Sequence, residues 1–159
     1  MEDIIDKKVI IVNGSDISNI KINIEPIKNV TSIKLVEVYA TLENANAYAN
    51  LKNIYVIIND YGLKTLYDNN HYKNGINVFS NIPFNSDINN NVLNGTGVIC
   101  NFNLDTQNYV FNPIKGELRT LDISFKNYNK ENQELEDFKD FAFSLELCIY
   151  SKRMKMTMF

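Results

Sequence analysis

Alternation of apolar and polar residues near the end of the chain constrains the fold more than any other feature. In the run FAFSLELCIY (141–150), every second residue is a large apolar one. Successive side chains of a β-strand point to opposite faces, whereas a helix would scatter these residues around its axis. The residues placed on one face are Phe141, Phe143, Leu145, Leu147 and Ile149. The run therefore predicts a strand that is buried on one face.

The run LRTLDISF (118–125) shows the same alternation. Its core face begins at Leu121 and continues through Ile123 and Phe125, while Thr120, Asp122 and Ser124 face the other way. We expect the apolar faces of these two runs to form part of one core.

Other segments carry the β-branched and aromatic residues that favour strands. They are 8–13, 20–24, 32–42, 53–60, 76–80, 97–104 and 109–112, the last ending at Pro113. Clusters rich in Asn and Gly, which accept turn conformations, separate most of them. Two further segments, 44–51 and 131–141, are predicted to form a short helical turn or a loop. The chain therefore has about eight or nine short strands.

Eight or so short strands in 159 residues predict an all-β fold. We expect a single jelly-roll sandwich of two antiparallel sheets, with a closed barrel as the alternative. The sequence shows no internal repeat, which argues against a propeller or β-helix. The predicted domain covers residues 1–150, and residues 151–159 form a basic and apolar C-terminal tail.

Charge and composition narrow the possible partners. The net charge is −3, and basic residues cluster in the tail alone, so direct nucleic-acid binding is not expected. The N-terminus lacks the pattern of a signal peptide, and no run reaches the roughly 18 apolar residues of a membrane helix. Cys100 and Cys148 are expected to be reduced and buried, with a disulfide between them as the alternative. We expect the protein to be made in a cytoplasm-like compartment.

The sequence offers few candidate catalytic residues. His71 is the single histidine and lies in a polar loop, where exposure is the simpler interpretation. Asp122 is mid-strand, where we expect an outward side chain paired with Lys or Arg. The acidic run 131–140 lacks the spacing of a calcium loop. Phosphate-binding, dinucleotide-binding and zinc-protease motifs are missing from the sequence. We therefore expect a non-enzyme without a cofactor or metal.

Three segments together resemble a known family. They are KNVTSIKLVEVYATLENANAYANLKNIYVIINDYG, YVFNPIKGELRTLDISFKN and DFAFSLELCIY. Their order and spacing are similar to those of single jelly-roll capsid proteins of large double-stranded DNA viruses and their relatives, virophages included. The resemblance covers roughly Asn29 to Tyr150. The Asn-rich stretch 82–97 departs from the pattern.

The resemblance implies a penton, the subunit that fills a five-fold capsid vertex as a homopentamer. The alternative within the family is another minor capsid protein of the same shell. Neighbouring major capsid proteins would be partners, and the location would be the virion, assembled in the host cytoplasm. The tail would reach a neighbouring capsid protein or an inner membrane, and we expect it to become ordered in the assembled shell. The tail residues singled out are Lys152, Arg153, Met154, Lys155, Met156 and Phe159.

Two other classes remain open. A stand-alone carbohydrate-binding β-sandwich would present an exposed aromatic platform, often with Trp, and the chain has no Trp. An enzyme such as a glycosidase or cupin would need a carboxylate pair or clustered histidines, and one histidine cannot supply a cupin site.

Overall fold

The structure is a computed structural model that describes residues 3–42, 53–67, 75–83, 97–101, 108–129, 134–138 and 141–154. These residues form ten strands and no helix. The strands are β1 (Asp3–Ser15), β2 (Asn19–Leu42), β3 (Asn53–Ile58), β4 (Lys64–Leu66), β5 (Ile76–Val78), β6 (Ser80–Pro83), β7 (Gly97–Asn101), β8 (Tyr109–Asn129), β9 (Glu134–Asp137) and β10 (Phe141–Met154).

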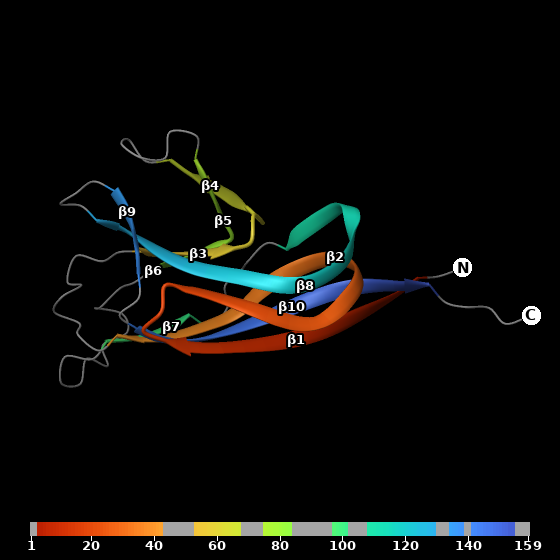
Figure 1. The fold of residues 1–159 in the computed structure, drawn as a ribbon, viewed down its shortest axis with the longest axis horizontal. Helices are drawn as coiled ribbons and strands as arrows, with labels where there is room; N and C mark the ends of the chain where they lie inside the picture. The colour runs from red at the N-terminus through yellow and green to blue at the C-terminus, as the bar shows by residue number, and fades with distance from the viewer. Residues whose placement is uncertain are drawn as a thin grey trace, which may run out of the picture.

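The strands form one curled antiparallel sheet and a small second sheet. The main order is β1-β10-β2-β8-β3-β6, with β7 added on β2 and β9 on β8, while β4 pairs with β5. Figure 1 shows the large sheet folded into two layers, with β1, β10 and β7 in one and β8, β3 and β6 in the other. The predicted fold class, an all-β jelly-roll-like sandwich of about eight strands, is confirmed.

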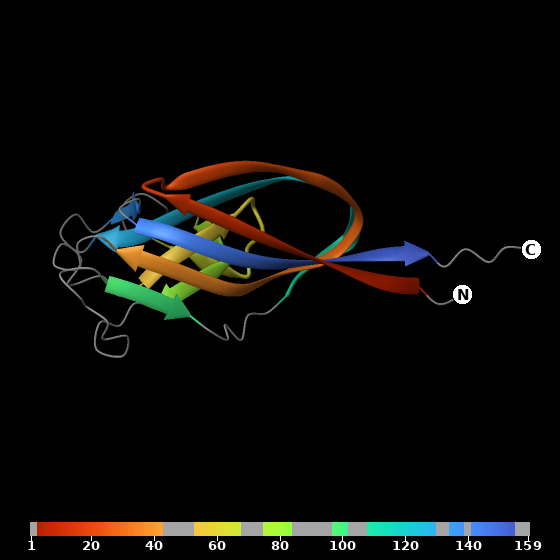
Figure 2. The ribbon, with the colours of Figure 1, turned by 90° about the horizontal axis from the view of Figure 1, so that it is seen from below.

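Strand β2 connects the two layers. Residues 19–33 pair with β8, and residues 30–42 pair with β10, so the two halves of the strand belong to different layers. The ladder with β8 is interrupted between Asn23 and Ile27, where Pro26 has no N–H to donate. Asn29 then takes a positive φ of 56°, which turns the chain further. Figure 2 shows β2 bending around one end of the sandwich.

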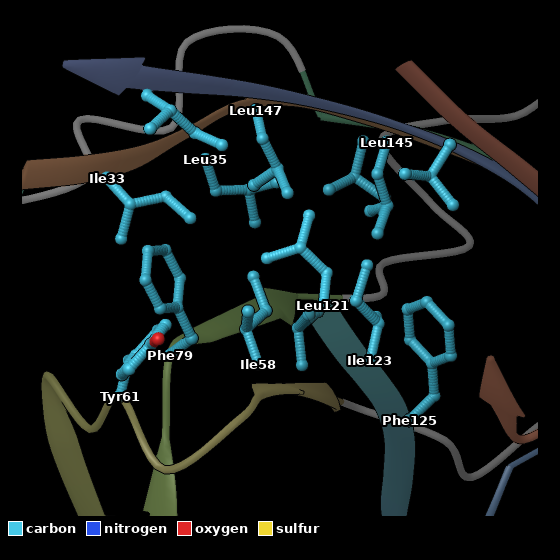
Figure 3. Close-up of a cluster of buried hydrophobic side chains, with 14 of the residues drawn as sticks. Ile33, Leu35, Ile58, Tyr61, Phe79, Leu121, Ile123, Phe125, Leu145 and Leu147 are labelled. Atoms are coloured by element: carbon cyan, nitrogen blue, oxygen red, sulfur yellow. The ribbon is translucent and has the colours of Figure 1, made fainter. Parts of the chain in front are cut away.

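The core lies between the layers. Leu145 and Leu147 of β10 point towards Leu121 and Ile123 of β8 (Figure 3). The phenylalanines Phe125 and Phe143 meet at a ring-centroid distance of 4.6 Å. Seven of the eight residues that the alternation places on core faces are buried: Leu121, Ile123, Phe125, Phe143, Leu145, Leu147 and Ile149. The side chain of the eighth, Phe141, lies outside the described part of the chain.

Strand β8 is longer than the sequence predicted. The segments 109–112 and 118–125 were expected to be separate, but both belong to one strand that passes through Pro113. The ladder with β2 is irregular here, since Ser32 pairs with Val110 and Val30 with Lys115. Proline is tolerated at such a bulge because the missing N–H leaves no ladder position empty. The segments 20–24 and 32–42 likewise merge into β2.

Two other boundaries differ from expectation. The segment 131–141, predicted as a helical turn or a loop, contributes β9, which pairs with the end of β8. Leu135 and Phe138 are buried, so packing overrides the weak local pattern. Strand β10 continues to Met154, so the domain boundary predicted at residue 150 falls inside a strand. The possible helix at 44–51 and most of the Asn-rich stretch 82–97 lie outside the described residues.

Candidate functional site

Strand β1 forms one edge of the large sheet and pairs with β10 along all thirteen of its residues. Within the described parts of the chain, no strand lies on its other side. Its outward side chains are unusually apolar for an edge, with Ile5 57%, Val9 45% and Ile11 63% exposed. A long edge strand with exposed apolar residues offers both hydrogen-bonding groups and apolar area to another chain.

Two glutamates lie opposite each other on the outer face of the same layer. Glu37 of β2 is the register partner of Glu146 of β10. Together with Ser144 and the exposed Ile11, they line a shallow hollow of about 120 Å³. Among the described residues, neither carboxylate forms an ion pair. Lys34, on the same face of the sheet, does not pair with either of them. Directly opposed like charges destabilise a sheet, so this pair opposes folding of the isolated subunit.

A basic groove lies at the end of the sandwich where β2 bends. Its volume is about 620 Å³, and it separates the paired ends of β1 and β10 from the bend. Those two strand ends run together past the bend in both ribbon views (Figures 1 and 2). The charged lining residues are the basic Lys7, Lys8, Lys28, Lys152 and Arg153 and the acidic Asp6 and Glu25. The groove is therefore positively charged, although the whole chain carries −3.

Two ion pairs neutralise part of this groove. Lys8 lies 3.3 Å from Glu25, and Arg153 lies 3.5 Å from Asp6. Both pairs are largely exposed, so each adds little to stability. Lys7 and Lys28 are exposed, and the described part of the chain gives them no ion-pair partner.

The predicted tail residues divide into two groups. Lys152, Arg153 and Met154 belong to β10, where they pair with Ile5, Ile4 and Asp3 of β1. These three residues therefore belong to the ladder between β1 and β10 and not to a separate tail. Lys155, Met156 and Phe159 lie outside the described residues.

The described candidate catalytic residues, Asp122 and Cys148, are not brought together into a site by the structure. Asp122 accepts a hydrogen bond of 2.9 Å from the side-chain amide of Asn19, in place of the expected Lys or Arg partner. Cys148 is a free, buried thiol. His71 and the side chain of Cys100 lie outside the description. The described residues contain no cluster of three metal-ligating side chains and no helix able to span a membrane.

Among the described residues, two side chains have a shifted pKa, and neither belongs to a reactive cluster. Burial raises the pKa of the Tyr55 hydroxyl above its ordinary value. A hydrogen bond and the charge of Glu117 raise the pKa of the exposed Arg119 guanidinium. Both shifts keep the residue in its usual protonation state near neutral pH.

The cluster of Tyr61, Tyr109 and Phe111 is packed rather than flat. Tyr61 stacks on Tyr109 at 5.0 Å, and Phe111 meets both rings edge-on. Tyr61 is itself buried. Rings that cover one another in this way do not form the open platform expected of a carbohydrate-binding module.

The opposed glutamates and the basic groove were not found from the sequence. Alternation places Glu146 outward, but its partner depends on the register of two strands more than a hundred residues apart. No protein-family model and no curated protein matches the chain, so its surfaces carry the functional argument.

Proposed function

We propose that this protein is a structural virion subunit, a single jelly-roll penton at the five-fold vertices of an icosahedral capsid. The observation that carries the proposal is the long edge strand β1 with its exposed Ile5, Val9 and Ile11. A stand-alone monomer normally protects such an edge by charge, proline or a covering loop. Here Asp6, Lys7 and Lys8 interrupt the strand, but Ile5, Val9 and Ile11 remain exposed on either side of them.

The fold supports the proposal in a second way. A jelly-roll-like sandwich has more than one side edge. In a ring that closes by rotation, every contact joins one edge of a subunit to a different edge of its neighbour. The large sheet offers distinct edges at β1 on one side and at β6 and β7 on the other. The sequence resemblance to single jelly-roll capsid proteins agrees with this use of the fold.

The experiment is to locate the protein in virus particles. An antibody against the chain should label purified particles at their vertices in electron micrographs, and the protein should co-sediment with the major capsid protein. Uniform labelling over the faces would favour a different minor capsid role. Loss of the protein from particles purified to constant composition would contradict a virion role of either kind.

A further inference from the structure

We propose that the basic groove of one copy docks on the hollow formed by Ile11, Glu37 and Glu146 of a second copy, in a head-to-tail contact. This proposal rests on the proposed assembly function and names the surfaces that the subunits would use. The acidic hollow carries two carboxylates without an ion pair in the described chain. The groove carries two exposed lysines, Lys7 and Lys28, which also have no ion pair in the described chain.

The two sets of charges lie apart in one subunit and form no ion pair with each other among the described residues. Lys7 lies opposite Tyr150 on β10, four residues from Glu146, and four residues of a strand span about 13 Å. Lys28 and Glu37 are nine residues apart on β2, or roughly 30 Å along the strand. No ion pair joins the two sets of charges in the described chain, so both are left to solvent or to a second molecule.

A second copy is the partner that carries both complementary surfaces. Each copy carries both the acidic hollow and the basic groove, so every subunit can offer its groove to one neighbour and its hollow to another. A contact between different patches on identical subunits generates a ring when the rotation closes. The exposed Ile11, beside the glutamates, supplies apolar area at the centre of the contact.

The proposed contact also explains why an unfavourable pair of glutamates is present. In the free subunit, Glu37 and Glu146 repel each other across the strands. A lysine from a second copy placed between them would convert this repulsion into attraction. The geometry therefore points to a contact whose electrostatic gain appears on association.

The test uses the full chain in three variants studied by light scattering after size exclusion. E37K/E146K reverses the hollow, and K7E/K28E reverses the groove. Each should raise the apparent dissociation constant by about tenfold or more, because like charges then face each other. Combining all four substitutions makes every hollow basic and every groove acidic, and this variant should regain the particle mass of the wild type.

The matched control is K21E/D60K, which reverses one exposed lysine and one exposed aspartate outside both surfaces. It should associate like the wild type. Circular dichroism melting curves verify that each variant is folded, and E37Q/E146Q replaces E37K/E146K if that variant does not fold. That milder variant should still weaken association by several-fold.

Association that is unchanged by either reversal, or that is not restored by the fourfold variant, would overturn the docking contact. A wild-type chain that never associates would overturn it too. Neither result decides whether the protein belongs to virus particles, since the labelling experiment tests that separately. Weakening by both reversals with recovery in the fourfold variant is the result expected.

Discussion

Asn59 and Asp122 exchange two hydrogen bonds where the ladder between β3 and β8 ends. The backbone N–H of Asn59 donates to the carbonyl oxygen of Asp122 at 2.8 Å. The backbone N–H of Asp122 donates to Oδ1 of Asn59 at 2.7 Å. The Asn59 amide also donates to the carbonyl oxygen of Thr120 at 3.2 Å. Asn59 itself has a positive φ of 48°, which asparagine accepts more readily than most residues.

Replacing Asn59 should therefore destabilise the sandwich. Asn59→Ala removes both side-chain hydrogen bonds and leaves a Cβ residue at positive φ, so we expect a loss of about 1–3 kcal/mol in the free energy of unfolding. Asn59→Gly loses the hydrogen bonds but relieves the backbone, and its loss should be smaller. Urea unfolding measures both. Equal losses would show that backbone conformation contributes nothing at this position.

Phe125 connects the layers through its contact with Phe143. Because both rings are buried, Phe125→Ala should leave a cavity and cost about 3–5 kcal/mol in unfolding free energy. The matched control is Val110→Ala on the same strand, where the side chain is 65% exposed. Its effect should stay within about 0.5 kcal/mol. A similar loss at the two positions would mean that β8 is not packed as described.

Gly14 lies opposite Phe143 in the pairing of β1 with β10. A Cβ at this position would come within 2.6 Å of the Phe143 ring, which is held in the core. Gly14→Ala should therefore cost about 1–3 kcal/mol by overpacking, measured by thermal or urea unfolding. Gly116→Ala is the control, because its added Cβ would meet nothing within 4 Å. An equal cost at Gly116 would point to glycine flexibility rather than to the ring contact.

Tyr55 gives the stability of the protein a dependence on alkaline pH. Burial raises its pKa in the folded state above the ordinary value of 10.0, so the unfolded chain loses this proton first. The stability is fully present below pH 10 and falls as the pH rises above it. In Tyr55→Phe, the fall between pH 10 and higher pH should be shallower than in the wild type. Parallel urea midpoints across that range check this, and identical slopes would argue against the shift.

The sequence predicted the core because alternation is a local signal. Leu121, Ile123 and Phe125 are recognisable from eight consecutive residues, and so are Phe143 to Ile149. Strand β9 was missed because its buried Leu135 and the buried Phe138 just after it are three residues apart and surrounded by charges. Pro113 appeared to end a strand, yet the bulge against β2 accommodates it. Long-range pairing decides both cases.

The candidate assembly surface was less predictable for the same reason. Ile5, Val9 and Ile11 resemble core residues in the sequence, because nothing local shows that β1 lies at an edge of the sheet. Glu37 and Glu146 become a pair through the register of β2 with β10, which includes a bulge between Glu146 and Leu147. Surface chemistry of this kind depends on the complete topology.

The mass of the purified wild-type chain in solution, measured by light scattering over a range of concentrations, tests the assembly claim most directly. We expect a closed particle of about five subunits of 18.3 kDa whose association weakens as salt is added, because a shorter screening length reduces charge attraction. A monomer at every concentration and salt level would contradict the claim that β1 and the charged surfaces exist for self-assembly.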